Sequence, residues 1–225
     1  MLINLRNALM AGKRTPTAKD YVQSGLVAMW DGIENAGWGT HNASATKWKD
    51  LVGNYDFNLN YSTTIYSNHI YCDGRQSAGD TGALIDVPAV TIEIVAQYLS
   101  SSVNTAIFMT GGNNSSYYTE VFAISASNTS FIFSYHNVDW KDTVVHSWSK
   151  NLGNTDCYKD GVNIGTKGNA TLDVSSARGY IGRIGGTGNV GCQCRIYSIR
   201  LYSRALTAEE IAANYAIDKA RFGLS

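Results

Sequence analysis

The sequence predicts an all-β protein in which two antiparallel sheets form a sandwich, with a short helix or arm at the N-terminus and a short helix at the C-terminus. About a dozen short apolar runs recur at spacings of roughly 8 to 12 residues, which is typical of a sandwich. Glycine is frequent, with 22 residues, and proline is rare, with 2. This balance is expected where Gly and Asn turns join many strands.

The length and composition favour one large domain. At 225 residues the chain has no Pro-rich or low-complexity linker, so we expect an arm over residues 1–20 and a sandwich over 21–225. Lys plus Arg number 18 and Asp plus Glu number 18, which gives no electrostatic reason to expect nucleic acid. No run of about 18 apolar residues is present, so we expect no membrane insertion.

The first residues predict a short amphipathic helix that ends before Pro16. Its apolar side consists of Leu2, Leu5, Leu9 and Met10. Basic residues follow this segment instead of preceding it, so we do not expect it to be a secretory signal. Residues 1–20 either cover one end of the sandwich or act as an arm that docks on other copies or other proteins.

The strands follow in order from residue 25. Residues 25–30 form a strand, and 33–54 form a long loop. Residues 91–98 alternate, with Ile92 and Ile94 on one face and Glu93 and Val95 on the other. The other strand candidates are 55–59, 65–66, 70–74, 82–87, 106–109, 120–125, 130–135, 142–149 and 180–182.

The last third of the chain carries the sharpest local signals. Asp160-Gly161 is the preferred pair for a tight hairpin turn within 156–165. A final strand begins at Cys194, and Thr207 with Glu210 forms a capping box for a helix that ends before Gly223.

Four cysteines are expected to be free thiols. Without a secretory signal, the chain is expected to be kept in a reducing compartment. Cys192 and Cys194 lie two residues apart, which places both sulfurs on one side of a strand. A metal site would need more soft ligands, and the sequence has no second pair.

Three segments resemble one protein family. Residues 25–32 read G-L-V-A-M-W-D-G, residues 48–54 read W-K-D-L-V-G-N, and residues 204–211 read R-A-L-T-A-E-E-I. They resemble the concanavalin A-like lectin/glucanase superfamily, and within it the laminin G-like domains of bacteriophage structural and bacterial surface proteins. The resemblance implies a jelly-roll β-sandwich over roughly 21–224.

The resemblance implies a non-enzymatic carbohydrate-binding or adhesion domain of a bacteriophage virion, in a tail, baseplate or receptor-binding component. Its partners would be cell-surface glycans, with other virion proteins or further copies of the chain. The protein would be made in the host cytoplasm and carried in the virion. The alternative is a bacterial surface lectin or polysaccharide-binding protein.

A glycan hydrolase is a weaker alternative. Glucan-cleaving relatives carry alternating carboxylates on one strand, because hydrolysis uses a pair of acids. Glu93 stands alone in its strand, and Glu209 and Glu210 belong to the first turn of a helix. We therefore expect no enzymatic activity.

Three loops supply candidate glycan contacts, because sugars stack on aromatic rings and bond to amide groups. The candidates are Trp38, His41 and Asn42 in one loop, Asn113, Asn114 and Tyr117 in a second, and Trp140 in a third. The alternative is that Trp38 and Trp140 fold inward and fasten their loops.

Calcium is the one cofactor that the resemblance implies. Asp31, Asp50 and Asn54 match acidic positions of the family around the long loop, and hard cations prefer oxygen ligands. The alternative is that Asp50 and Asn54 cap turns through backbone hydrogen bonds.

Overall fold

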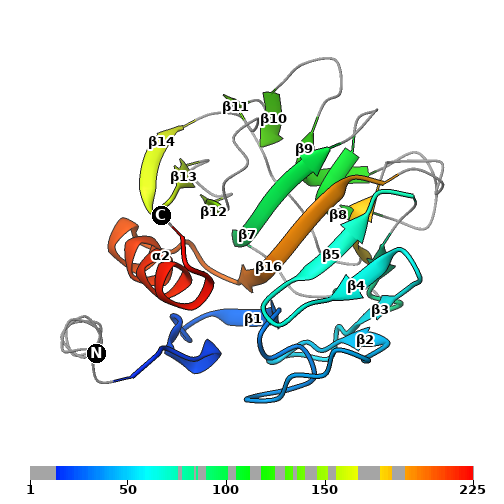
Figure 1. Ribbon diagram of the computed structural model, residues 1–225. Coiled ribbons are helices and arrows are strands. Elements are labelled where there is room, and N and C mark those ends of the chain that lie inside the picture. Colours follow the sequence, from blue (N-terminus) through cyan, green and yellow to red (C-terminus); the bar gives the residue numbers. More distant parts are fainter. Residues whose placement is uncertain are drawn as a thin grey trace.

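Two antiparallel sheets lie face to face, and a helix packs on the outer face of one of them (Figure 1). The computed structural model describes residues 14–75, 78–83, 85, 90–100, 105–111, 118–124, 130–133, 136–139, 146–151, 156–166, 178–183 and 191–224. The predicted all-β sandwich with a short C-terminal helix is confirmed. The predicted N-terminal helix lies outside the described residues, apart from Arg14.

The first sheet has the strand order β14-β13-β12-β7-β16-β5-β4, and β1 pairs with β16 beside this path. Its strands are β1 (Leu26–Asp31), β4 (Thr63–Ile65), β5 (Ile70–Asp73), β7 (Thr91–Ser100), β12 (His146–Asn151), β13 (Asp156–Lys159), β14 (Val162–Thr166) and β16 (Gln193–Tyr202).

The second sheet has the order β11-β10-β9-β8-β15-β6-β3-β2. Its strands are β2 (Lys47–Trp48), β3 (Phe57–Leu59), β6 (Gly79–Asp80), β8 (Thr105–Gly111), β9 (Tyr118–Ile124), β10 (Ser130–Phe133), β11 (His136–Asp139) and β15 (Arg178–Arg183). Of the strand predicted over 82–87, only residues 82, 83 and 85 are among the described ones, and β6 lies just before it. Gly82 has a φ of 64° and donates its N–H to the Asp80 side chain, which ends the strand in a turn.

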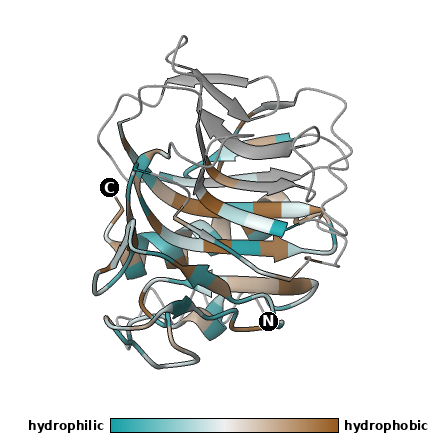
Figure 2. Ribbon diagram, turned by 90° about the vertical axis from the view of Figure 1, so that its right-hand side faces the viewer, coloured by the Kyte–Doolittle hydropathy of each residue, from teal (hydrophilic) through white to brown (hydrophobic). Residues whose placement is uncertain are grey.

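An aromatic cluster joins the two sheets. Trp30 of β1 lies 4.8 Å from Phe57 of β3, measured between ring centroids, and Phe57 lies 6.5 Å from Phe108 of β8. All three side chains are fully buried. Large rings at this separation contribute both buried area and favourable ring–ring contacts to the core. Hydrophobic and polar residues alternate along several strands (Figure 2).

Strand β7 shows the predicted alternation, but both of its faces are buried. Ile92 and Ile94 lie in the core between the sheets. Glu93 and Val95, on the other face, are also buried. The reason is the helix α2 (Ala208–Phe222), which covers this part of the outer face; Val95 packs in one cluster with Phe222.

Strand β16 contains a bulge that the sequence did not predict. Ile196 and Ile199 both point into the core, although residues three apart in a regular strand face opposite sides. The pairing register with β7 shifts between Ile196 and Ser198, so Tyr197 is the extra residue. At this point β16 also exchanges its second neighbour, from β5 to β1.

The predicted turn and helix ends are confirmed. Asp160 and Gly161 have φ values of 51° and 74°, as the tight β13–β14 hairpin requires. Thr207 accepts the N–H of Glu210 and closes the capping box of α2, and Gly223 ends the helix with a φ of 69°. No helix in the described ranges is long and apolar enough to cross a membrane.

The four cysteines are free and buried, as predicted. The sulfurs of Cys192 and Cys194 lie 3.5 Å apart in the core, and Cys72 of β5 is paired opposite Cys194. Bonds from the neighbouring thiols of Cys192 and Cys72, together with burial, raise the pKa of the Cys194 thiol. The buried cysteines therefore act as small apolar side chains of the core.

A buried ion cluster fastens α2 to the first sheet. The Arg200 guanidinium lies 2.8 Å from Glu93 and 2.7 Å from Asp218, which belongs to α2. The Arg200 side chain is fully buried. Tyr21 donates its hydroxyl to Asp218 over 2.7 Å, and its ring centroid lies 4.0 Å from the guanidinium carbon. Burial, opposed by Arg200, raises the pKa of Glu93.

Arg200→Met should lower the free energy of unfolding by roughly 3–5 kcal/mol, because it leaves two carboxylates buried without a countercharge. Urea denaturation followed by circular dichroism measures this. Arg75→Met is the matched control, since Arg75 pairs with Asp73 over 3.0 Å at the surface. The control should cost less than about 1 kcal/mol. Equal effects for the two variants would contradict the importance of the buried cluster.

Candidate functional site

The loop between β1 and β2 begins with a side-chain turn. Asp31, the last residue of β1, accepts the backbone N–H groups of Ile33 and Glu34 over 2.9 and 3.0 Å. The Trp48 indole donates to the Asp31 carbonyl over 2.9 Å and so fixes the other end of the loop. Gly37 and Gly39 take positive φ values, which allow a tight reversal between them.

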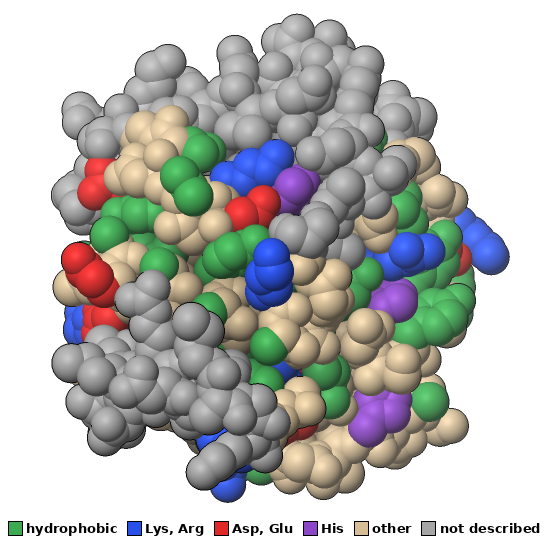
Figure 3. Space-filling model, turned by 60° about the vertical axis from the view of Figure 1, so that its left-hand side comes forward, with side chains coloured by type: hydrophobic (Ala, Val, Ile, Leu, Met, Phe, Trp, Pro, Cys, Tyr) green, Lys and Arg blue, Asp and Glu red, His purple; other side chains and the backbone are tan. Residues whose placement is uncertain are grey.

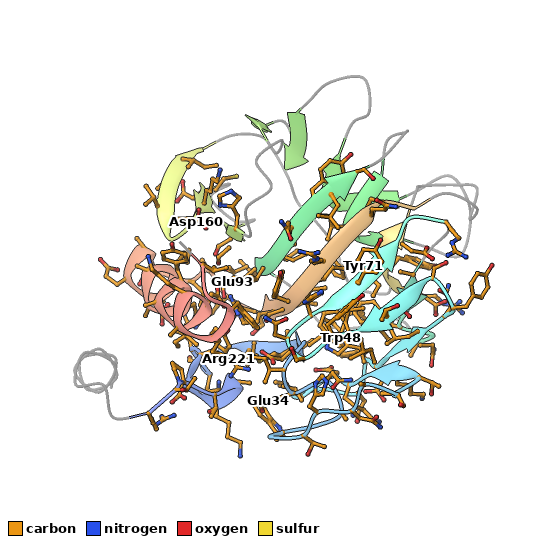
Figure 4. All side chains as sticks on the ribbon, in the orientation of Figure 1. Glu34, Trp48, Tyr71, Glu93, Asp160 and Arg221 are labelled. Carbon is orange, nitrogen blue, oxygen red and sulfur yellow. The ribbon has the colours of Figure 1, made fainter. Side chains whose placement is uncertain are left out.

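Buried Glu34 holds the middle of this loop. Its carboxylate accepts the N–H of Gly39 over 2.8 Å and that of Ala18 over 2.9 Å. Arg221 of α2 approaches Glu34 at 3.2 Å and Asp31 at 2.8 Å, and Figure 4 shows Arg221 and Glu34 close together. Although burial opposes ionisation, the donors from Ala18, Gly39 and Arg221 lower the pKa of Glu34. The loop is thus anchored to the helix by a charged group.

Buried Asn35 holds the far side of the loop. Its side chain donates to the Asn42 carbonyl and accepts the Asn42 N–H, both over 2.9 Å. The Asn42 side chain in turn accepts the N–H of Ser44. Since every one of these bonds lies within the loop, its backbone is fixed before any ligand arrives.

The predicted residues Trp38, His41 and Asn42 lie together on this anchored loop. The Trp38 side chain is 37% exposed, and the Lys19 ammonium lies 5.4 Å from its ring centroid. His41 is exposed and its Nδ1 lies 3.2 Å from the Ile33 carbonyl. We call Lys19, Trp38, His41 and Asn42 the Trp38 surface. It presents one aromatic ring beside a cation and polar groups.

The other predicted glycan contacts belong to two further loops. Asn113, Asn114, Tyr117 and Trp140 lie outside the described residues. The strands that flank them, β8, β9 and β11, can be placed: β11 is at one edge of the second sheet and β2 is at the other. Neighbouring strands are about 4.8 Å apart, so the two edges are separated by roughly 30 Å along the sheet.

A cavity lies next to the Trp38 surface, between residues 19–24 and α2. Its volume is about 290 Å³, and Lys19 belongs to both features. The walls include Tyr21, Val22 and Ile217. The polar groups of Asn214 at this cavity are already bonded, to the Val22 N–H, Glu93 and Tyr202. The cavity therefore offers a largely apolar surface, with Lys19, Asp20 and Glu210 as the charged residues of its lining.

The predicted calcium ligands already have partners within the chain. Asp31 pairs with Arg221, and Asp50 accepts the N–H groups of Met29 and Tyr55. Among the described residues, no group of three or more His, Cys, Asp or Glu side chains is arranged to hold a metal ion. Calcium at Asp31, Asp50 and Asn54 would have to displace these donors, and it stays a prediction that melting curves with and without millimolar calcium would test.

Comparison with known proteins concerns the fold. No protein-family model matches the sequence, and no curated protein sequence matches it. Trypanosoma rangeli sialidase in complex with 2,3-difluorosialic acid matches with a TM-score of 0.59 and 11% identity, over 96% of this chain and 38% of the sialidase. A mutant of HCR/D matches with a TM-score of 0.55 and 13% identity, over 85% of this chain and 50% of the other.

These matches establish a likeness of β-sandwich fold, consistent with the predicted concanavalin A-like fold. The CBM40 domain of Ruminococcus gnavus IT-sialidase bound to alpha2,3 sialyllactose also matches, but its TM-score of 0.41 is too low to carry an argument. This chain spans about 38% of the length of the sialidase that it resembles.

The ionisation of Asp31 should make the free energy of unfolding depend on pH. Burial, opposed by Arg221, raises the pKa of Asp31 to about 6. An unfolded Asp titrates near about 3.9, so between these values the folded chain binds more protons here, and stability falls as the pH rises. Measured by urea denaturation, the stability of the natural protein relative to Asp31→Asn should decrease from about pH 4 to pH 6 and then stay level. Parallel curves for the two proteins would contradict this assignment.

Proposed function

We propose that this chain is a non-catalytic carbohydrate-binding domain that contacts its glycan through the Trp38 surface. The observation that carries the proposal is the exposed Trp38 ring on a loop whose backbone is held by buried Glu34 and Asn35. A pre-fixed loop binds without first having to be ordered, which favours affinity.

The chemistry of the Trp38 surface suits a sugar. The C–H face of a sugar ring stacks on an indole, while hydroxyl groups bond to polar neighbours such as His41 and Asn42. The Lys19 ammonium lies at the ring and adds a donor. The adjoining cavity of about 290 Å³ gives room for a further sugar unit.

Two further arguments support a carbohydrate ligand. The sequence resembles concanavalin A-like lectins, and the sialidase with a similar fold was crystallised with a sialic acid derivative. This chain spans 38% of that protein, and our proposal for it concerns binding alone. The lone Glu93 on β7, engaged with Arg200, gives no carboxylate pair for glycosidic cleavage on that strand.

The family and the biological location of this domain are a more specific proposal, which rests on the sequence resemblance alone. The laminin G-like assignment, the place in a bacteriophage virion and association with other virion proteins or further copies belong to it. A bacterial surface lectin is the alternative, and the neighbouring genes distinguish the two.

Trp38→Ala should reduce binding on a glycan array, and in titrations of the glycans that bind, by about tenfold or more, because it removes the stacking ring. Tyr61→Ala is the matched control: Tyr61 is 76% exposed and lies outside the Trp38 surface. The control should bind as the natural protein does.

Two outcomes would contradict the proposal. Absence of binding to every glycan would remove the carbohydrate-binding function. Release of reducing sugar from a polysaccharide panel would replace it with a hydrolase, the weaker alternative.

A further inference from the structure

Four residues form a straight row across the outer face of the first sheet. Thr64 of β4 lies opposite Tyr71 of β5, Tyr71 lies opposite Arg195 of β16, and Arg195 lies opposite Gln97 of β7. Directly opposed residues share a face and stand about 5 Å apart. We call these four residues the Arg195 row.

The row faces away from the core. The adjacent residues in the same strands, Ile70, Cys72, Cys194 and Ile196, all lie in the core between the sheets, and side chains alternate along a strand. Thr64 is exposed, Tyr71 and Arg195 are half-buried, and Gln97 is buried beneath Arg195, with which it bonds. The strands that carry the row are therefore held by the core beneath them, and the outer side of the row is accessible to solvent.

Helix α2 covers only part of this outer face. Its last turn packs over Tyr197, whose ring centroid lies 5.5 Å from that of Phe222. In Figure 1, α2 lies beside the C-terminal end of β16, and β5 and β4 lie on the far side of β16 from it. The Arg195 row lies on this second part of the face, two residues beyond Tyr197 along β16.

Aromatic rings border the row. Tyr66 stacks on His69 with centroids 4.8 Å apart and an interplanar angle of 15°, and its edge approaches Tyr71 at 6.3 Å. Tyr66 is 49% exposed. Burial, together with nearby Arg195, lowers the pKa of His69 to about 4, so the ring is neutral at pH 7. Figure 3 shows hydrophobic, His and Lys or Arg side chains side by side at one edge of the surface.

Among the described residues, the hydrogen-bond partners seen for Arg195 are all neutral. Its guanidinium donates to the Gln97 side-chain oxygen over 2.9 Å and also bonds to the Tyr197 hydroxyl. By contrast, Arg200 and Arg204 each pair with carboxylates of the chain. The nearest carboxylate on the row's side of β5, Asp73, is itself paired with Arg75. Arg195 thus retains its charge for an anion.

We propose that the Arg195 row is a second binding site, for a glycan that carries a carboxylate. Arg195 receives the carboxylate, since a guanidinium bonds carboxylates through two parallel N–H groups. Tyr71 and Tyr66 contact the sugar ring, Thr64 meets a hydroxyl, and Gln97 holds the Arg195 guanidinium in place from below. The inference rests on the proposed carbohydrate-binding function, but it uses residues separate from the Trp38 surface.

Isothermal titration with acidic probes tests the site. The probes are sialyllactose and trigalacturonic acid, with the methyl esters of both and lactose as uncharged comparisons. At least one acid should bind, and its methyl ester should bind at least tenfold more weakly. Arg195→Gln should weaken the acid at least tenfold and leave the ester unchanged, because the ester has no charge to lose.

Matched variants separate this site from other effects. Lys47→Gln removes one positive charge from an exposed residue of β2, in the other sheet, and should not change the affinity. Tyr66→Ala, at an exposed ring, should weaken the acid and the ester alike. An unchanged melting curve shows that Arg195→Gln is folded. If this variant does not fold, Arg195→Lys is used in its place. It keeps the charge but loses the two parallel N–H groups, so it should still bind the acid more weakly.

The outcomes distinguish this inference from the proposed function. No binding of either acid, equal binding of acid and ester, or full affinity in the Arg195 variants overturns the inference. If neutral glycans still bind and are lost in Trp38→Ala, the proposed function stands without it. If the acids bind and depend on Arg195 but not on Trp38, the Trp38 surface is the part that fails.

Discussion

The buried guanidinium of Arg200, held between Glu93 and Asp218, determines how the elements outside the two sheets are placed. Glu93 and Arg200 lie opposite each other on β7 and β16, and Asp218 comes from α2. Burying a charge is costly unless a partner is in place. Any shift of α2 along the sheet would separate Asp218 from Arg200 and leave its carboxylate unpaired in a dry interface. The cluster therefore fixes the helix in one position, which apolar packing alone would specify less sharply.

The position of α2 in turn determines the geometry of the Trp38 surface. One turn beyond Asp218, Arg221 reaches Asp31 and Glu34. Glu34 accepts the N–H of Gly39, next to Trp38. A chain of charged contacts thus runs from the sheet through the helix to the loop that presents the exposed ring. We therefore expect a substitution in the buried cluster to change the position of the loop, so that stability and the proposed ligand binding would be coupled.

Local features could be predicted from the sequence, and long-range pairings could not. The capping box of Thr207, the Asp160-Gly161 turn and the alternation in β7 depend on neighbouring residues, and all three were confirmed. Glu93 was seen as a lone acid, because its partner Arg200 lies 107 residues further on. The Trp38 loop was predicted from its composition, but Glu34, which anchors it, was not singled out. The alternation of side chains along β16 places Arg195 on the outer face of the sheet. Only the pairing register of β16 with β5 shows that Arg195 lies beside Tyr71.

The two parts of one sheet face differ in chemistry because the helix covers only one of them. Beneath α2, water is excluded, and the arginine there is bonded to two carboxylates. Beyond the end of α2, water reaches the face, so Arg195 remains charged with only neutral partners in the described contacts. A guanidinium at that border is partly desolvated, which strengthens its attraction to an anion relative to a fully exposed one. The same helix that closes one part of the sheet thereby leaves the other part open, which is where we propose that a charged ligand binds.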